Sequence, residues 1–440
     1  MNKIKNLLGR VGLKLQRLTG YQAPDVLHRY KHYEDIIKGE RETIERMSSY
    51  KALADTFYEI GEKGEFFEEY RKNNITFTDE DVKPIAFYLP QFYTFPENDE
   101  WWGKGFTEWT NVTKAVPQFI GHYQPHLPYD NTFYDLSDVS VMHHQVALAK
   151  NYGVYGFCFH YYWFNGKRLL EKPLDNYLED KSIDFPFCIN YANENWSRRW
   201  DGSESQILMK HEHSDNDDLA CIADICRYVR DERYIKVKGK PLIILYNATS
   251  HPDISRAINI WRKYCRENGI GEIHLACAQT YLVSNPLTFG FDDVVEFPPH
   301  FMNTRAKLMP LDKILQLENK NEFHNFDTEE YIANKLHHTD EPERIYKTVF
   351  PGWDNTARRG SKGTVYHVTP KLYKKWLLDI MKHTVEKREP KDRFVFINAW
   401  NEWAEGAHLE PDRRYGYAYL SATADAVLEA QNTRVTHTKL

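Results

Sequence analysis

Eight short, continuous apolar runs fill the chain from residue 84 onward, and they constrain the fold more than any other feature. An uninterrupted apolar run is typical of a parallel strand buried on both faces, whereas a strand with one wet face alternates apolar and polar residues. The sequence therefore predicts an α/β protein with parallel strands. The runs span residues 84–92, 154–164, 185–196, 241–248, 273–280, 292–299, 345–353 and 393–403.

Helix-prone stretches separate most of these runs, most clearly at residues 138–152, 217–234, 253–268 and 370–387. Eight strands alternating with helices predict a (β/α)8 TIM barrel, with a doubly wound open sheet as the alternative. The open sheet is disfavoured because no GxGxxG motif follows the first run and no P-loop sequence occurs. We expect the barrel at residues 83–440, after a basic amphipathic helix at 1–24 and a helical extension at 25–82.

Polar and aromatic residues gather where each run ends. In a barrel these carboxyl ends meet at one rim, where active sites lie, so we expect a substrate-binding site there. An aromatic loop after the first run is expected to join it, although this loop could instead be a structural plug. The candidate residues are Tyr88, Gln91, Trp101, Trp102, Glu108, Trp109, His160, Tyr161, Tyr162, Trp163, Asn190, Asn193, Glu194, Trp196, Tyr246, Gln279, Glu296, Trp353, Asp354, Asn398, Trp400 and Asn401.

Composition narrows the class of ligand. The chain has 57 Lys+Arg and 63 Asp+Glu, a formal net charge of −6, which argues against binding nucleic acid. Aromatic residues make up 15%, with 11 Trp and 29 Tyr. Aromatic rings stack on the C–H faces of sugars while polar neighbours bind the hydroxyls. The expected partner is an oligosaccharide or another glycan.

The cysteines and the N-terminus bear on location. None of the 6 cysteines forms a CxxC pair, so we expect reduced core thiols and a cytoplasmic protein. The first twenty residues hold five Lys and Arg, no acid and one apolar stripe, and they lack the pattern of a secretory signal. Such a helix can lie on an anionic membrane surface, at the inner face of the cytoplasmic membrane, or pack on the protein's own core.

The segment from Asn398 to Gly406, NAWNEWAEG, carries the sharpest chemical signal. Glu402 and Glu405 stand three apart at the end of the last run, among tryptophans. Cleavage of a glycosidic bond needs one carboxylic acid to protonate the leaving oxygen and a second carboxylate to assist at the sugar. Aromatic walls exclude water and can raise the pKa of the acid. The alternative is a strand end with two solvated or ion-paired glutamates.

The longer block NAWNEWAEGAHLEPD resembles the carboxyl-terminal signature of the WbsX family of bacterial polysaccharide-biosynthesis proteins, which is similar to glycoside hydrolase family 99. Further similar segments run from residue 84 to 417: IAFYLPQF, WWGKGFTEWTNV, YGFCFHYYWF, NYANENWSRRW and FPGWDN. The resemblance implies a barrel acting on α-mannosidic bonds with retention. It implies that Glu402 assists the sugar's 2-hydroxyl, through a 1,2-anhydro intermediate, and that Glu405 is the general acid and then base.

This sequence departs from family 99 at two positions. Ala404 and Ala407 stand where those hydrolases typically have His and Thr, which bears on mannosidase specificity. Three functions remain open: a retaining glycosidase-like enzyme in assembly of a cell-surface polysaccharide such as O-antigen or capsule, a glycosyltransferase using a nucleotide- or lipid-linked donor, and a carbohydrate-binding barrel without catalysis.

No cofactor or metal is expected for the reaction. His211 and His213 alternate without a third ligand, so zinc is disfavoured there. The acids at 215, 217 and 218 open a predicted helix and are expected to cap it. The pairs at 143–144 and 337–338 lie in helical contexts and are expected on the surface.

Overall fold

The computed structural model describes residues 38–39, 51–52, 54–56, 58–59, 61–130, 132–198, 203–280, 285–309, 323–339 and 341–437. The chain divides into two compact units, residues 1–58 and 59–440. The described residues of the first unit are helical. The predicted basic helix at 1–24 lies outside the described residues.

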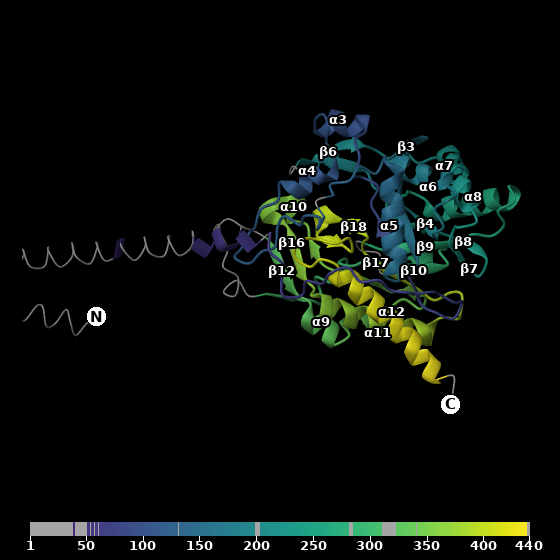
Figure 1. The fold of residues 1–440 in the computed structure, drawn as a ribbon. Helices are drawn as coiled ribbons and strands as arrows, with labels where there is room; N and C mark the ends of the chain where they lie inside the picture. Colours follow the sequence, from purple (N-terminus) through teal and green to yellow (C-terminus); the bar gives the residue numbers. More distant parts are fainter. Residues whose placement is uncertain are drawn as a thin grey trace, which may run out of the picture. The chain divides into compact units, whose positions relative to one another are not determined.

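The second unit (Figure 1) is built on a barrel of parallel strands, as the apolar runs predicted. The short strands β13 and β14 are two halves of the seventh barrel strand. β13 pairs with β10 on one side, and β14 pairs with β17 on the other. This shared strand closes the barrel. Around the barrel the order is β1 (Lys83–Tyr88), β2 (Gly156–Phe164), β4 (Phe187–Tyr191), β8 (Lys240–Leu245), β9 (His274–Gln279), β10 (Asp293–Glu296), β13 (Ile345–Tyr346) with β14 (Thr348–Val349), and β17 (Phe394–Ile397).

Helices connect most of these strands, and side chains cap the N-termini of most of these helices. Ser214 accepts from the Asp217 N–H at the start of α7, so the three acids there occupy the first turn, where they also suit the helix dipole. Between β9 and β10, the described residues contain a 3₁₀ turn, η3 (Pro286–Phe289), instead of an α-helix. The helices are α5 (Val139–Asn151), α6 (Glu171–Glu179), α7 (Asp215–Val229), α8 (Ile254–Glu267), α11 (Pro370–Lys387) and α12 (Ala418–His437).

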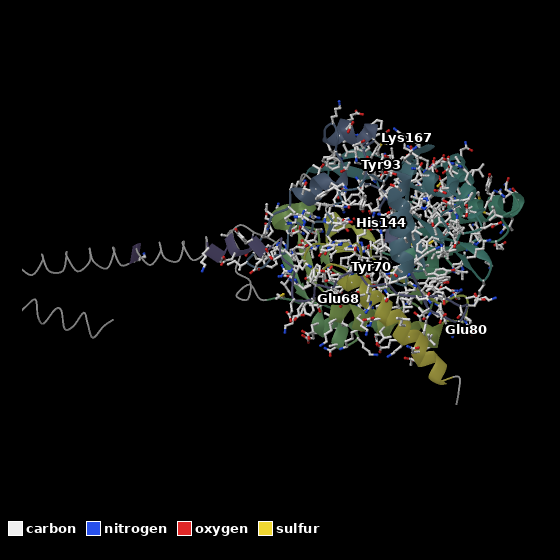
Figure 2. All side chains as sticks on the ribbon, viewed as in Figure 1. Glu68, Tyr70, Glu80, Tyr93, His144 and Lys167 are labelled. Atoms are coloured by element: carbon white, nitrogen blue, oxygen red, sulfur yellow. The ribbon has the colours of Figure 1, made fainter. Side chains whose placement is uncertain are left out.

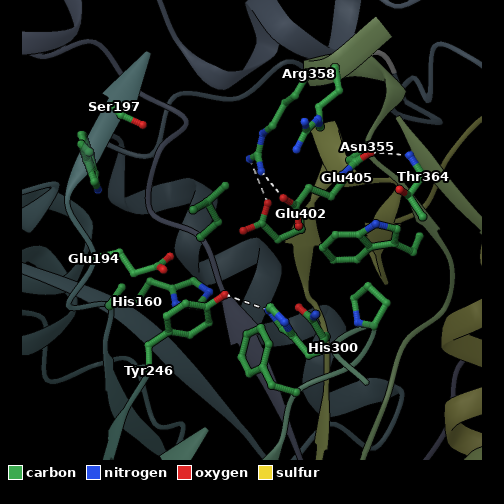
Figure 3. A pocket seen from close by; sticks show the side chains of 18 of the residues that line it. His160, Glu194, Ser197, Tyr246, His300, Asn355, Arg358, Thr364, Glu402 and Glu405 are labelled. Atoms are coloured by element: carbon green, nitrogen blue, oxygen red, sulfur yellow. Dashed lines mark hydrogen bonds and ion pairs between the residues drawn. The ribbon is translucent and has the colours of Figure 1, made fainter. Parts of the chain in front are cut away.

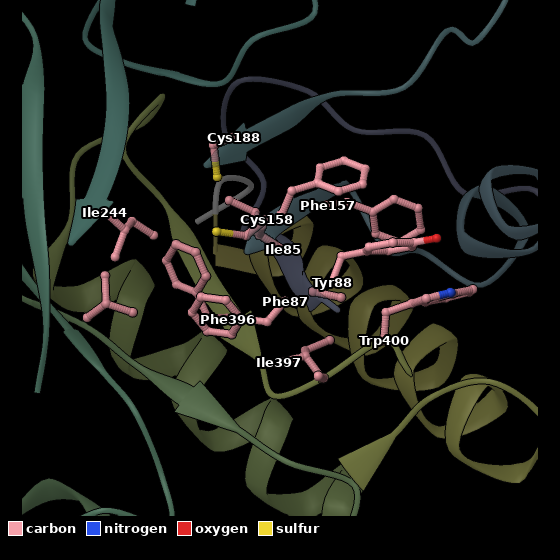
Figure 4. Packing of buried hydrophobic residues seen from close by; sticks show 14 of the residues in the cluster. Ile85, Phe87, Tyr88, Phe157, Cys158, Cys188, Ile244, Phe396, Ile397 and Trp400 are labelled. Atoms are coloured by element: carbon pink, nitrogen blue, oxygen red, sulfur yellow. The ribbon is translucent and has the colours of Figure 1, made fainter. Parts of the chain in front are cut away.

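The barrel core is aromatic. Phe87 packs against Phe297, Phe396 and His160, with ring centroids 4.8, 5.4 and 5.8 Å apart. Successive strand residues face opposite sides, so Tyr88 points the other way, toward a second aromatic layer under the helices (Figure 4). This alternation also decides which polar residues can reach a site inside the rim.

The helical extension predicted for residues 25–82 is helical at its described residues from 38 to 59 but not in the segment directly before β1. Residues 61–82 are extended or turned, and Glu68 bridges to Gly416. The ring of Tyr70 packs edge-on against Tyr152 and Tyr417, at 6.1 and 5.5 Å (Glu68 and Tyr70 are labelled in Figure 2). Local charge made this segment look helix-prone, but its contacts with the barrel unit hold it extended.

No helix among the described residues is long and apolar enough to cross a membrane.

Several insertions follow the carboxyl ends of the barrel strands. The insertions are α3 (Pro96–Trp102) and α4 (Glu108–Thr113) after β1; β3 (Lys167–Leu169) after β2; the hairpin β5 (Trp196–Arg198) and β6 (Ser203–Met209) after β4; β11 (Lys307–Leu308), β12 (His324–Asp327), α9 (Glu329–Ala333) and η5 (Leu336–His338) after β10; β15 (Trp353–Asp354), α10 (Thr356–Arg359) and β16 (Thr364–His367) after β14; and β18 (Asn401–Glu402), η7 (Trp403–Glu405) and β19 (Ala407–His408) after β17.

Candidate active site

A cavity of about 1260 Å³ lies at the carboxyl rim, enclosed by the barrel and these insertions. Its lining mixes aromatic rings, histidines, arginines and carboxylates. The structure thus brings 11 of the 24 candidate residues of the sequence into the lining of one cavity. They are Gln91, Trp102, His160, Tyr162, Glu194, Trp196, Tyr246, Trp353, Asn398, Glu402 and Glu405.

One arginine binds both proposed catalytic carboxylates and a third acid. Arg358 Nη2 lies 3.0 Å from Glu402 Oε2, its Nη1 lies 2.5 Å from Glu405 Oε1, and its Nε lies 2.7 Å from Glu108 Oε1 (the first two contacts are in Figure 3). The guanidinium fork suits this arrangement because its N–H donors point outward in one plane. Three carboxylates therefore share one directly bonded cation in a buried site.

Burial and mutual repulsion shift the pKa values of this cluster. Burial is the largest cause that raises the pKa of Glu402, to about 8. Repulsion from Glu405 and Glu108 raises it further, and the attraction of Arg358 offsets only part of the rise. Burial also raises the pKa of Glu405, again against the attraction of Arg358. Burial opposes the charge of Arg358, but the three carboxylates hold its pKa well above the usual range. The raised pKa values favour a proton on this pair of acids near neutral pH, and acid–base chemistry requires such a proton.

The backbone of the NAWNEWAEG segment is fixed by its own side chains and by a glycine. Asn401 accepts from the Leu89 N–H at 2.7 Å and donates to the Leu89 carbonyl at 2.9 Å, tying the segment to the end of β1. Gly406 has φ +59°, and a Cβ there would lie 3.0 Å from the Cβ of Asp354. Only glycine fits this close approach without strain.

Asp354 also positions the arginine. Its Oδ1 accepts from the N–H and hydroxyl of Thr356 at 2.9 and 2.6 Å, which starts the short helix α10 that carries Arg358. Its Oδ2 binds His122 Nε2 at 2.6 Å and Gln124 Nε2 at 2.8 Å. Asp354 thus acts behind the cavity wall rather than in it, contrary to its predicted place.

A second buried carboxylate braces the same segment. Glu410 accepts from the indoles of Trp400 and Trp403 at 3.1 and 2.6 Å, from Gln145 at 2.6 Å and from Tyr134 at 2.7 Å. Burial raises its pKa to about 7, and the four donors oppose that rise. Trp400 was predicted to contact substrate, but its ring lies behind the catalytic pair and holds Glu410.

The opposite wall carries neutral donors and acceptors. Glu194 and His160 lie across the cavity from Arg358, and the hydroxyl of Tyr246 lies 3.3 Å from His300 Nε2 (Figure 3). Burial lowers the pKa values of His160 and His300 to about 4 each, so both rings are neutral at pH 7. Neutral imidazoles, a phenol and a carboxylate are groups that bind sugar hydroxyls.

Strand alternation explains several wrong predictions. His160 and Tyr162 of β2 face the cavity, whereas Tyr161 and Trp163 point the other way, to Asp224 and Asp217 respectively. The sequence analysis had assigned all four to the site. Because consecutive strand residues face opposite sides, only every second one can reach the barrel interior.

The other candidates outside the lining have structural partners or lie behind the cavity. Glu296 binds the buried ammonium of Lys347 at 2.9 Å, so it stabilises the seventh strand. Tyr88 donates to Gln145. Asn190 contacts His160 from behind, at 3.1 Å. Five others lie outside the lining: Trp101 packs on Trp196, Trp109 packs on Trp403, Asn193 bonds Asn247 and Ser250, Asn401 bonds Leu89, and Gln279 ends β9. Glu108 is fully buried and reaches the pair only through Arg358.

The sequence analysis missed Arg358, which has more contacts with the predicted acids than any candidate it named. The signal was present, because three acids predicted at one mouth need a cation and an arginine doublet follows the seventh run. His300 and Tyr366 were also missed, since they line the cavity from insertions whose folding the apolar runs do not describe.

A parallel barrel that gathers carboxyls at its carboxyl rim, in a cavity with aromatic and polar walls, is typical of carbohydrate-active enzymes. Residues 84–423 match the family model described as glycosyltransferase WbsX. The chain belongs to this family.

Two similar curated proteins carry the name uncharacterized protein WxcX, from two strains of Xanthomonas campestris pv. campestris. Each is 46% identical over 347 residues, which is 79% of this chain and 50% of the relative. The chain thus spans about half the length of these relatives. Two solved structures of the GH99 endo-α-mannosidase from Bacteroides thetaiotaomicron have TM-scores of 0.50 and 0.51 at 14% and 15% identity. They cover 82% of this chain and 100% of their own, and they share the fold.

Proposed function

We propose that this protein is a retaining, glycosidase-like enzyme that hydrolyses or transfers an α-linked, mannose-like sugar. The observation that carries the proposal is the pair of buried Glu402 and partly buried Glu405, which line one cavity wall and bond the same guanidinium. Glycosidic chemistry needs two carboxyls in different protonation states at one place. The raised pKa of Glu405 supports its role as the proton donor, whereas Glu402, whose pKa is raised to about 8, acts as the base only in its ionised form.

In the first step, the Glu402 carboxylate takes the proton of the sugar's 2-hydroxyl, and the 2-oxygen attacks C1. The bond from C1 to the leaving oxygen breaks as Glu405 donates its proton to that oxygen. A 1,2-anhydro sugar forms, and C1 has been inverted once. Arg358 stabilises whichever carboxyl carries the negative charge, because it contacts both.

In the second step, the Glu405 carboxylate takes a proton from water or from an acceptor hydroxyl, whose oxygen attacks C1. The anhydro ring opens, and the 2-oxygen recovers its proton from Glu402. The second inversion gives net retention. The same two residues thus serve hydrolysis and transfer, and exclusion of water from the cavity decides between them.

The family description favours a second candidate, a glycosyltransferase that uses a nucleotide- or lipid-linked donor. Arg359 lines the cavity beside Arg358 and adds a second cation to this wall. A diphosphate leaving group needs such charges. In either case we place the reaction in assembly of a cell-surface polysaccharide such as O-antigen or capsule.

A screen of α-configured glycosides and nucleotide sugars separates these functions. Release or transfer of sugar from a glycoside, lost in Glu405→Gln, supports the first. Release of a nucleoside diphosphate supports the second. Glycan binding without turnover, unchanged in Glu405→Gln, contradicts both and leaves a carbohydrate-binding barrel.

We also propose that residues 1–24 attach the protein reversibly to the inner face of the cytoplasmic membrane. Each Lys or Arg near an anionic surface contributes about 1 kcal/mol, and the apolar stripe adds burial. Full-length protein should co-sediment with anionic vesicles at low salt and much less at high salt. If a form beginning near Asp25 binds equally well, the helix is not the attachment.

A further inference from the structure

A second group of titratable side chains lies outside the cavity lining, where η5 packs against helix α11. The turn η5 supplies His337 and His338, and the helix supplies Asp379 and His383 one turn apart. The sequence predicted that His337 lies on the surface. This is wrong, because its side chain is fully buried against the helix.

Two imidazoles of this group point at one carboxylate oxygen. His337 Nε2 and His338 Nε2 each lie 2.9 Å from Asp379 Oδ2. Nitrogen and oxygen atoms that bind one zinc ion tetrahedrally at about 2.0–2.2 Å lie about 3.3–3.6 Å from one another. The three atoms lie within 4.8 Å of one another, so small shifts of the side chains bring them to the spacing of a coordination shell.

The outer ring contacts match those of a metal site. His338 Nδ1 lies 2.7 Å from Glu341 Oε1, and Glu341 is held in turn by His383 at 3.1 Å. Metal-binding histidines commonly donate their second N–H to a carboxylate, which fixes the ring. Lys335 binds the outer oxygen of Asp379 at 2.7 Å, so Oδ2 remains directed at the two imidazoles.

The hydrogen-bond inventory of His338 demands an additional positive charge. A carboxylate oxygen faces each of its ring nitrogens, at 2.7 and 2.9 Å. A neutral imidazole has one N–H and one lone pair, so one nitrogen would face an anionic oxygen without a proton between them. Either a second proton or a metal ion must fill that position.

We propose that His337 Nε2, His338 Nε2 and Asp379 Oδ2 bind a divalent transition-metal ion, with zinc as the best match. Two imidazoles and a carboxylate suit zinc, and water completes a tetrahedral shell. The ion joins the segment between β12 and β13 to α11, so its role is to stabilise the barrel wall rather than to take part in sugar chemistry.

A similar cluster elsewhere shows what the proposal requires. His213, Asp218 and His251 also lie close together. There the Asp253 N–H donates to His251 Nδ1 at 3.0 Å, so the neutral ring keeps its proton on Nε2, where Asp218 lies 3.1 Å away. That nitrogen has no lone pair for an ion.

The test is titration of chelator-treated, full-length protein with Zn²⁺ and with Co²⁺, read by calorimetry and by the visible absorption of tetrahedral Co²⁺. We expect one ion per chain at this site. Asp379→Asn and His338→Ala should each weaken binding at least tenfold, and Glu341→Gln by about 10- to 100-fold. His143→Ala is the matched control, because His143 and Asp180 form an exposed pair 2.8 Å apart and belong to none of the three-residue clusters among the described residues.

A second readout covers variants that fold poorly. Saturating Zn²⁺ should raise the unfolding midpoint of the wild-type protein and of His143→Ala, because an ion that binds only the folded state stabilises it. Absence of binding to the wild-type protein, or binding unchanged in both Asp379→Asn and His338→Ala, would overturn the proposal. The additional charge at His338 would then be a proton.

Discussion

Glu402 and Glu410 lie on the same stretch of chain, and both are buried, yet their surroundings are opposite. Glu410 accepts four hydrogen bonds from neutral donors. Glu402 faces the cavity and shares one guanidinium with two other acids. Burial raises the pKa of Glu410 to about 7 and the pKa of Glu402 to about 8. A raised pKa therefore does not identify the reactive acid, whereas access to the cavity and incomplete neutralisation do.

The largest expected effect is on turnover. Glu402→Gln and Glu405→Gln should each lower the rate by about 10²–10⁴ or more while the fold is kept, since general acid–base groups contribute that much. A substrate with an activated leaving group should rescue Glu405→Gln and not Glu402→Gln, because only Glu405 protonates the leaving oxygen. Equal rescue of both would contradict the division of roles.

Removal of Arg358 should produce the next largest effect. Arg358→Met leaves three buried carboxyls without their bonded cation, which costs about 3–5 kcal/mol of stability when the acids are ionised. The penalty should be larger at pH 8 than at pH 5, because the carboxyls take up protons at low pH. Denaturant unfolding at both pH values measures it. A loss of stability that does not depend on pH would mean that Arg358 contributes through packing and not through its charge.

The two acids also differ in how a neutral substitute behaves. Glu410→Gln places an amide N–H among four donors, which should cost about 1–3 kcal/mol and lower the unfolding midpoint. Glu402→Gln should lower the free energy of unfolding by less, because Arg358 still bonds Glu108 and Glu405. Thermal unfolding of the two variants at pH 7 makes the comparison. Equal decreases in the unfolding midpoint would contradict the view that Glu410 is structural and Glu402 is reactive.

The smallest effect is a pH trend in stability. The pKa of Glu402 is raised in the folded protein, so the folded state holds its proton at pH values where the unfolded chain loses it. Its contribution to stability is present below about pH 4.3 and is lost as pH rises through about 8. The stability of Glu402→Gln relative to wild type should therefore rise by about 1 kcal/mol or more between pH 5 and pH 8. A flat difference would contradict the raised pKa.

The barrel was predictable because its strands are buried on both faces, which leaves continuous apolar runs in the sequence. The helix predicted at 370–387 matches α11 at both ends, where Thr369 caps it. The segment at 61–82 was not predictable, since its extended form depends on contacts such as Arg71 with Asp425, far away in sequence. Local propensity carries no information about such partners.

The same limit applies to the candidate site. Glu402 and Glu405 could be named because their spacing is local, and their placement on the cavity wall follows from one strand end. Which of Tyr161 and Tyr162 faces the cavity depends on the strand's phase relative to the barrel axis, which an apolar run on both faces conceals. Arg358 reaches the acids from a different insertion, and only the closed barrel brings the two together.

The most direct test is an NMR time course of the first product released from an α-configured substrate, with wild-type protein and Glu405→Gln side by side. We predict that the α-anomer forms first with the wild-type protein, and that the same substrate remains intact over that period with the variant. Initial formation of the β-anomer, or equal rates for the two proteins, would contradict a retaining mechanism carried by Glu402 and Glu405.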